Sequence, residues 1–249
     1  MLLLSSASLS GYGLHKIFLL AKEAEYDGID LSIDFDQYDT CDTSYIDSLV
    51  QTSGINVLSI SAPERRVTKK QVDEVLSIAS NLGVPLVNLH PPHRLDKEKD
   101  WFGEYLRVLE SKYPNITIAV TNAPPKTWLF IISEYGDARP ETIKKITSHT
   151  ALSIANVEPE SGIDLMKTFT LLGNTIAHVY LSDKTEERNY IFPGEGDMPL
   201  ESLLIRMREA GYVGPFSLLV DPREISAGSD PLLVERLREA RKFLLKYFS

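Results

Sequence analysis

The stretch from residue 176 to residue 216 decides the fold, and it reads Ile176-Ala177-His178-Val179-Tyr180-Leu181-Ser182-Asp183, then Pro193-Gly194-Glu195-Gly196-Asp197, then Gly211-Tyr212-Val213-Gly214-Pro215-Phe216. Its first part alternates polar and apolar side chains with the period of two that a β-strand produces. A segment of helical period, residues 200–210, lies between the two glycine-containing turns. Strand, turn, helix, turn and strand in this order predict one β/α unit of a parallel sheet.

The same alternation extends over the whole chain and predicts eight such units. Strands are expected at residues 2–8, 28–34, 55–60, 85–90, 116–122, 151–157, 176–183 and 214–221. Helices are expected at residues 14–26, 43–53, 68–81, 97–113, 140–148, 163–172, 200–210 and 231–247. Because barrels of eight β/α units typically run to about 250 residues as one domain, the chain is predicted to be a single (β/α)8 TIM barrel over residues 1–249.

Glycines mark several of the predicted helix ends. Gly54, Gly83, Gly173 and Gly211 each follow a run of helical period, where a left-handed C-terminal cap favours glycine. Residues 123–139 stay open between a short extra strand, a helical turn and a lid over the barrel mouth. The alternative fold is a doubly wound open sheet, but the first expected strand is not followed by the Gly-x-Gly-x-x-Gly turn of dinucleotide-binding proteins.

Composition and charge exclude several classes of protein. The chain carries 26 Lys and Arg against 35 Asp and Glu, a net charge of −9, and this negative field repels nucleic acid. A single cysteine, Cys41, excludes an intramolecular disulfide framework. Residues 1–6 lack a basic leader, and no stretch approaches the roughly 20 apolar residues that span a bilayer. We therefore expect a soluble, cytoplasmic protein without nucleic-acid or membrane partners.

Polar residues cluster at the carboxyl ends of the expected strands, where the active sites of such barrels lie. On the strand at 176–183, His178, Tyr180 and Ser182 share one side, and Val179 and Leu181 share the other. If the apolar pair faces the helices, the polar side chains line the lumen. The same alternation places further polar side chains on the lumen side of other strands: Asp30, Ser32, Asp34, Asn88, His90, Ser217 and Asp221.

A polar lumen suggests a small polar ligand, since burying such groups without partners is costly. Asp, Asn, His, Ser and Thr side chains suit hydrogen bonds to the hydroxyl groups of a sugar. The alternative to a ligand site is an internal hydrogen-bond network with trapped water. A single residue at a strand end can also be polar only because the strand end meets solvent.

The stretch quoted first resembles the xylose-isomerase-like barrel family, which includes sugar-phosphate isomerases, ketose epimerases, inosose dehydratases and endonuclease IV. In that family a strand reading roughly His-x-His-x-x-Asp leads to Pro-Gly-x-Gly, a helix, and Gly-Tyr-x-Gly before the eighth strand. Two further segments match the family pattern more weakly. They are Tyr26-Asp27-Gly28-Ile29-Asp30, and Leu82-Gly83-Val84-Pro85 followed by His90-Pro91. The resemblance covers essentially the whole chain and is specific in its last third. It implies an isomerase or epimerase of a sugar or sugar phosphate.

Family members commonly hold a divalent metal with a Glu on strand five, an Asp on strand six, a His on strand seven and a Glu on strand eight. At these positions this chain has Thr121, Asn156, Tyr180 and Leu219. The resemblance therefore implies a divergent member without the usual metal site, and no cofactor is expected. A displaced metal stays open, because Asp221 and Glu158 lie two residues beyond Leu219 and Asn156.

His90 matches the strand-four histidine that binds metal in the endonuclease branch of the family. The other ligands of that metal site, on strands six and seven, are missing in this chain. A trinuclear zinc site is therefore excluded on residue type. The loop at residues 193–197 lies where such barrels often bind phosphate, but Glu195 and Asp197 would repel an anion, so a tight structural turn is favoured.

The resemblance and the strand-end positions together give a set of candidate site residues. The predicted catalytic residues are His90, His178, Asp183 and Asp221. The predicted ligand-binding residues are Asp34, Asn88, Thr121, Asn156, Glu158, Tyr180 and Arg223. Two functions stay open: a sugar isomerase or epimerase, and a non-catalytic sugar-binding protein of the same fold. By analogy with relatives, homo-oligomers are a further expectation.

Overall fold

Eight parallel strands close into a barrel in a computed structural model that describes residues 1–65, 68–94, 102–124, 127–128, 132–135, 139–157, 164–225 and 228–249. Around the barrel the strands follow the order β1 (Leu2–Ser5), β12 (Phe216–Leu218), β9 (Ile176–Leu181), β8 (His149–Ser153), β5 (Thr117–Thr121), β4 (Leu86–Leu89), β3 (Val57–Ser61) and β2 (Gly28–Ser32). Every neighbouring pair is parallel. The predicted (β/α)8 barrel is confirmed.

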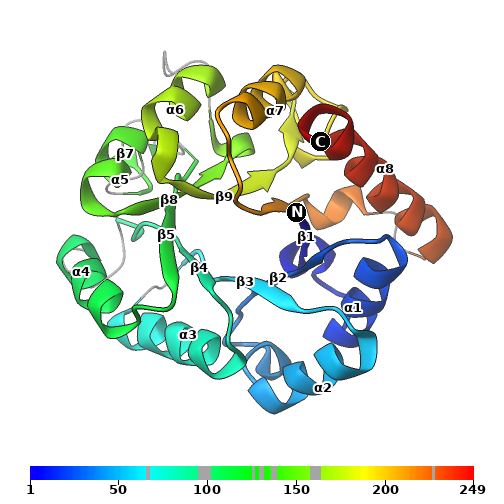
Figure 1. Cartoon of the computed structure of the whole chain (residues 1–249), viewed down its shortest axis with the longest axis horizontal. Helices are drawn as coiled ribbons and strands as arrows, with labels where there is room; N and C mark the ends of the chain where they lie inside the picture. Colours follow the sequence, from blue (N-terminus) through cyan, green and yellow to red (C-terminus); the bar gives the residue numbers. More distant parts are fainter. Residues whose placement is uncertain are drawn as a thin grey trace.

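Eight α-helices of the described part form a ring outside these strands (Figure 1). They are α1 (Leu14–Glu23), α2 (Thr43–Ser53), α3 (Lys69–Leu82), α4 (Phe102–Lys112), α5 (Pro140–Ile146), α6 (Leu165–Leu172), α7 (Leu200–Glu209) and α8 (Asp230–Phe248). The expected starts of two helices, at residues 97 and 163, lie outside the described residues. None of the helices in the described ranges combines the length and the apolarity that crossing a membrane requires.

Local capping explains where several helices begin and end. At α2 the Asp42 carboxylate accepts hydrogen bonds from the first backbone N–H groups, and Gly54 ends the helix with φ +76°. At α3 Thr68 and Gln71 form a reciprocal capping box, and Gly83 ends the helix with φ +66°. Both glycines adopt the left-handed conformation that other residues disfavour, as the sequence predicted.

Two packing layers follow from the alternation along each strand. Val179 and Leu181 on β9 belong to the large apolar cluster between strands and helices. Tyr180 belongs instead to a small second cluster with Ala119 and Ala151. Its hydroxyl lies 2.6 Å from Ser61 Oγ, although β9 and β3 are not adjacent in the barrel, so this contact crosses the lumen. Further fully buried polar side chains occupy the inward positions: Asp30, Ser59, Asn88, His178 and Ser217. The predicted polar lumen is therefore present.

Most strands end earlier than the sequence predicts, and on two of them, β8 and β12, side chains replace the ladder hydrogen bonds. On β8 the amide group of Asn122 accepts from Ser153 N (2.7 Å) and donates to Ser153 O (3.0 Å), and a 3₁₀ turn, Ile154–Asn156, follows. On β12 the Ser8 hydroxyl donates to Leu218 O (3.2 Å) and accepts from Val220 N (3.0 Å). Both caps come from residues that lie far away along the chain.

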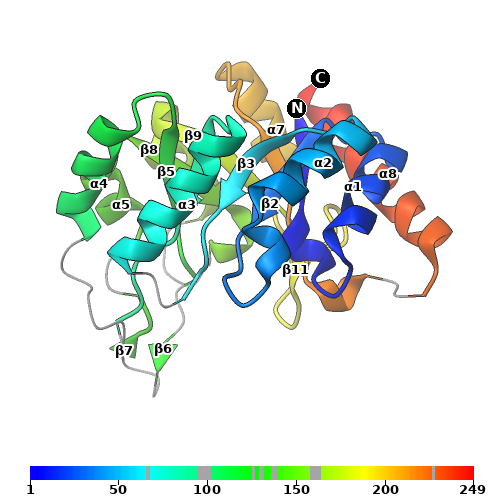
Figure 2. The same cartoon turned by 90° about the horizontal axis from the view of Figure 1, so that it is seen from below.

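Short antiparallel pairs extend the barrel at one end. Within residues 123–139, β6 (Thr127–Trp128) pairs with β7 (Ile132–Ser133), so of the three alternatives the short strand is the one observed. Residues 125–126, 129–131 and 136–138 of this segment lie outside the described part. After β9, β10 (Asp183–Lys184) pairs with β11 (Asn189–Ile191). Figure 2 shows β6, β7 and β11 at one end of the barrel and both termini at the other. The first end is the mouth formed by the carboxyl ends of the strands.

Candidate functional site

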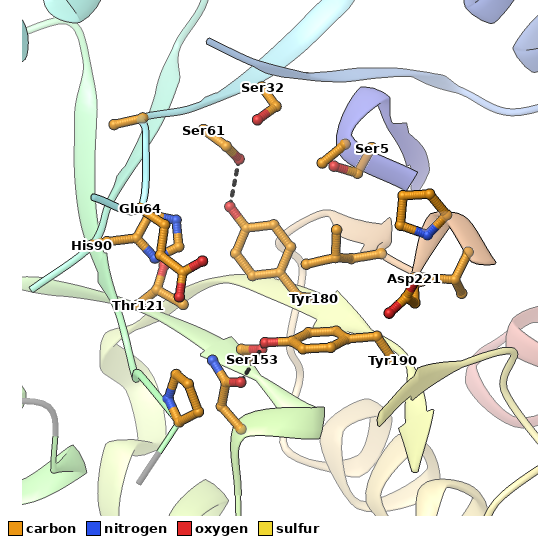
Figure 3. Close-up of a pocket in the computed structure, with 17 residues that line it drawn as sticks. Ser5, Ser32, Ser61, Glu64, His90, Thr121, Ser153, Tyr180, Tyr190 and Asp221 are labelled. Atoms are coloured by element: carbon orange, nitrogen blue, oxygen red, sulfur yellow. Dashed lines mark hydrogen bonds between the residues drawn. The ribbon is translucent and has the colours of Figure 1, made fainter. Parts of the chain in front are cut away.

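A pocket of about 290 Å³ opens at this mouth (Figure 3). Its polar lining in the described residues consists of Ser5, Ser32, Ser61, Glu64, His90, Thr121, Ser153, Asn156, Tyr180, Tyr190 and Asp221. Most of these residues end a strand or follow one directly. Because the strands are parallel, their carboxyl ends converge, and the fold brings together side chains from all parts of the chain.

The four positions that hold metal in the family all line this pocket. Thr121 ends β5, Asn156 closes the turn after β8, Tyr180 lies on β9, and Leu219 follows β12. The fold therefore brings the four positions that the resemblance selected together in one pocket.

A divalent metal does not fit these four positions. Leu219 has no ligand atom, the Tyr180 hydroxyl is hydrogen-bonded to Ser61, and Asn156 Oδ1 accepts a hydrogen bond from the Tyr190 hydroxyl. Such cations prefer carboxylate and imidazole ligands in proteins. Within the described ranges, no three His, Cys, Asp or Glu side chains are arranged to hold an ion. The residues at these four positions therefore do not supply the ligands that such an ion prefers.

Acid–base groups stand on opposite walls of the pocket. In Figure 3 Glu64 and His90 lie beside each other on one wall, and Asp221 lies on the other. Desolvation lowers the pKa of His90, and the nearby Glu64 carboxylate acts in the opposite direction. A neutral imidazole and a carboxylate can both accept a proton.

Hydrogen bonds hold both carboxylates of the pocket in place. The Glu64 carboxylate accepts from the Tyr135 hydroxyl. Asp221 accepts from the Arg223 backbone N–H (2.9 Å) and from its guanidinium group, 2.5 Å away at the closest, and this pairing lowers the pKa of Asp221. The Arg223 side chain itself is 89% exposed, so the predicted ligand-binding residue lies at the rim and positions Asp221.

Tyr190 closes the pocket with a backbone conformation that is rare for its type. Its φ is +57°, in the left-handed region that favours glycine. Its hydroxyl donates to Asn156, and its carbonyl oxygen accepts from Asp221 N (2.7 Å). Burial raises the pKa of Tyr190 to about 12. The contacts of Tyr190 with two lining residues hold its ring against the pocket.

Below the pocket a buried polar network fills the lumen. Ser61 Oγ lies 2.9 and 3.1 Å from the two carboxylate oxygens of Asp30, and the Tyr180 hydroxyl lies on its other side. His178 Nε2 lies 2.7 Å from Ser217 Oγ, and burial lowers the pKa of His178 to about 3. This imidazole is predicted to be catalytic, but the structure places it under Tyr180, whose ring it contacts edge to face.

Besides His178 and Arg223, three further predicted residues in the described part lie outside the pocket lining. Asp183 is buried, and its carboxylate accepts four backbone N–H groups of its own loop. Asn88 donates to Ser59 Oγ deep in the lumen (2.9 Å). The Asp34 carboxylate accepts from Asp36 N and from the Gln37 side chain in a surface turn. Glu158 lies outside the described residues.

The loop at residues 193–197 is the tight turn that its acidic side chains favoured. The backbone N–H groups of Gly194 and Gly196 donate to Asp183 Oδ2 at 3.0 and 3.1 Å, so they are directed at the chain's own carboxylate. A Cβ atom on Gly196 would lie 2.4 Å from Asp183 Oδ1, which explains the second glycine of the motif.

Sequence reasoning missed several polar residues of the lining. Ser5 and Ser153 each end a strand, so the period-two pattern could have found them. Glu64 and Tyr190 lie in the segments after β3 and β9, whose paths no periodicity encodes. The single signal at Tyr190 would be its positive φ, which is a property of the folded chain.

Comparisons with known proteins agree with this architecture. The family model "Xylose isomerase-like TIM barrel" matches residues 18–247. A D-allulose 3-epimerase from Methylomonas sp. in complex with D-allulose is 12% identical, with a TM-score of 0.71, over 99% of this chain and 96% of that one. An L-ribulose 3-epimerase is 15% identical, with a TM-score of 0.72, over 98% and 93%.

The IOLI protein with a bound zinc atom is 17% identical, with a TM-score of 0.73, over 100% of this chain and 99% of that one. No curated protein sequence matches the chain. At these identities the solved structures establish the fold, and the match of the family model over most of the chain establishes the family. The chain belongs to the xylose isomerase-like TIM barrel family.

Proposed function

We propose that the chain is a divergent isomerase or epimerase that acts on a small neutral sugar without the divalent metal of its family. The observation that carries this proposal is one mouth pocket with Glu64 and His90 on one wall and Asp221 on the other. Isomerisation and epimerisation of a sugar both begin with removal of a proton next to a carbonyl group. Epimerisation returns the proton to the opposite face, so it requires proton-transferring groups on two sides of the ligand.

The size and charge of the pocket support a single neutral monosaccharide. Its volume of about 290 Å³ lies at the lower end of the range for small-molecule sites, about 300–1,000 Å³. The described lining contains no Lys or Arg, while Glu64 and Asp221 are acidic. A sugar phosphate would bring negative charge next to these carboxylates, so a neutral sugar is favoured over its phosphate.

A second candidate function is a non-catalytic sugar-binding protein. The observation that favours it is the neutral character of all four metal-ligand positions, including the apolar Leu219. Such a protein would keep the polar pocket and would not transfer protons.

The two functions are separated by hydrogen exchange at the sugar. The full chain, treated with a chelator, is incubated with D-allulose or L-ribulose in D₂O, and nuclear magnetic resonance follows the C1 and C3 positions. We expect deuterium incorporation that added divalent metal does not raise. Glu64→Gln and His90→Gln should each lower the rate by about 100-fold, the usual contribution of one acid–base group. His149→Gln removes an exposed imidazole outside the pocket and should leave the rate unchanged.

The remaining outcomes each decide between the functions. Thermal stabilisation by either sugar without exchange would support the binding protein, since a ligand of the native state raises the apparent stability. Exchange that requires added metal would contradict the metal-independent mechanism. Neither exchange nor stabilisation with the sugar panel would contradict both functions for neutral ketoses.

A further inference from the structure

We propose that Tyr180 exchanges a proton with an oxygen of the bound sugar, and that Ser61 and Asp30 supply and take back that proton from below. Tyr180 is the catalytic residue in this scheme, and Ser61 and Asp30 are positioning residues. The inference deepens the proposed function and depends on it for the identity of the ligand. The state of the buried carboxyl group can be measured without any ligand.

A continuous hydrogen-bond chain connects the lumen to the pocket. The Asp30 carboxyl oxygens lie 2.9 and 3.1 Å from Ser61 Oγ, and Ser61 Oγ lies 2.6 Å from the Tyr180 hydroxyl. Tyr180 and Ser61 line the pocket, and Figure 3 shows their hydroxyl groups facing each other. Asp30 lies one layer deeper and is 0% exposed. A proton can pass along this chain without entering solvent.

Asp30 has no cation to stabilise its charge. Among the described residues it forms no ion pair, and its neighbours are the hydroxyl groups of Ser5, Ser59 and Ser61. Desolvation raises the pKa of Asp30, and the three serine hydroxyls act in the opposite direction. A carboxyl group in such surroundings is stored as the neutral acid, which can donate a proton.

The direction of the hydrogen bonds follows the protonation of Asp30. When Asp30 is neutral, it donates to Ser61, Ser61 donates to Tyr180, and the Tyr180 O–H is left to donate into the pocket. When Asp30 is ionised, Tyr180 donates to Ser61, Ser61 donates to Asp30, and Tyr180 presents a lone pair to the ligand. The carboxyl group therefore selects whether the pocket meets a donor or an acceptor.

Enolisation of a sugar carbonyl uses the first state and produces the second. Glu64 or His90 takes the carbon-bound proton, and the carbonyl oxygen takes the proton of the Tyr180 hydroxyl. The Ser61 proton moves to Tyr180, and the Asp30 proton moves to Ser61. One proton has then passed from Asp30 to the sugar oxygen, with no net change at Ser61 or Tyr180. Collapse of the enol reverses each transfer.

The surroundings of Tyr180 make this resupply necessary. Burial raises the pKa of Tyr180, and Asp30 acts in the same direction once it is ionised, so a bare phenolate is unfavourable in the lumen. The other groups that face Tyr180 carry no positive charge: His178, whose buried imidazole is neutral, contacts the ring edge to face, and Tyr190 lies across the pocket. The Ser61 and Thr121 hydroxyl groups, both in the pocket lining, act in the opposite direction and lower the pKa of Tyr180.

Infrared spectroscopy of the full chain without sugar tests the state of Asp30. We expect the carbonyl band of a protonated carboxyl group at neutral pH, lost in Asp30→Asn and shifted in frequency in Ser61→Ala. Asp34→Asn removes a surface carboxylate and should leave the band unchanged. A wild-type spectrum without the band, or a band that Ser61→Ala does not shift, would overturn the relay whether or not any sugar reacts.

Hydrogen exchange at D-allulose tests the transfer itself. Tyr180→Phe keeps the ring and should lower kcat by about 100-fold with little change in KM, since it removes a proton donor and retains the packing. Ser61→Ala should lower kcat similarly, and Ser61→Thr, which keeps a hydroxyl group, should restore most of it. An unchanged kcat in Tyr180→Phe would overturn the role of Tyr180. An equal loss of kcat in Ser61→Ala and Ser61→Thr would overturn it as well, because the retained hydroxyl group would then make no difference. Absence of exchange in the wild type would contradict the proposed function, while the infrared result would still decide the relay.

Discussion

Asp183→Ala is expected to destabilise the chain by roughly 3–5 kcal/mol, because one buried carboxylate organises an entire loop. The Asp183 side chain is 1% exposed and accepts backbone hydrogen bonds from Lys184, Gly194, Gly196 and Met198 at 2.9–3.1 Å. Alanine leaves these N–H groups without an acceptor, and a buried donor without a partner costs about 1–3 kcal/mol. Water can reach part of this loop, so the total falls below the sum for four groups.

Urea denaturation followed by circular dichroism measures this effect. Asp197→Ala is the matched control, because Asp197 lies in the same loop with an exposed side chain, and it should change stability by no more than about 0.5 kcal/mol. Equal midpoints for the Asp183 variant and the control would show that the carboxylate does not organise the loop.

His178 is expected to make the chain markedly less stable in acid. Burial lowers the pKa of His178 to about 3 in the folded chain, from about 6.5 when the chain is unfolded. Between these values the unfolded state binds more protons than the folded state, so stability falls as the pH decreases through this range. The contribution is fully favourable above pH 6.5, and its loss reaches roughly 3 kcal/mol by about pH 4.

The variant His178→Gln isolates this contribution from those of other groups. Asp30 acts with the opposite sign, since its raised pKa means that the folded state binds more protons, and its contribution is lost as the pH increases. The quantity to compare is therefore the change in unfolding free energy between pH 7 and pH 4, which should be smaller in His178→Gln by roughly 3 kcal/mol. His149→Gln, at an exposed position, is the control and should follow the wild-type profile. A His178→Gln profile parallel to the wild type would contradict a neutral buried imidazole.

Much of the candidate site was predictable, because strand ends in a parallel barrel always converge. His90, Thr121, Asn156, Tyr180 and Asp221 were selected from strand-end positions and from the family resemblance, and all line the pocket.

Residues that lie one layer below the mouth were harder to assign. Asp183 and His178 match family positions in the sequence, but the structure directs Asp183 into its own loop and places His178 under the Tyr180 ring. Glu64 and Tyr190 reach the pocket from loops, whose course depends on contacts elsewhere in the molecule.

The sequence by itself determined the eight β/α units and, for several strands, the side that faces the lumen. These features depend on residue type and on neighbours two to four positions apart, and such local periods are present in the unfolded chain. Only the tertiary structure decided which polar groups meet. Ser61 and Tyr180 are 119 positions apart, and Ser8 and Leu218 are 210 apart. Such pairs form when the barrel closes, and closure also buries Asp30 and His178, which shifts their protonation.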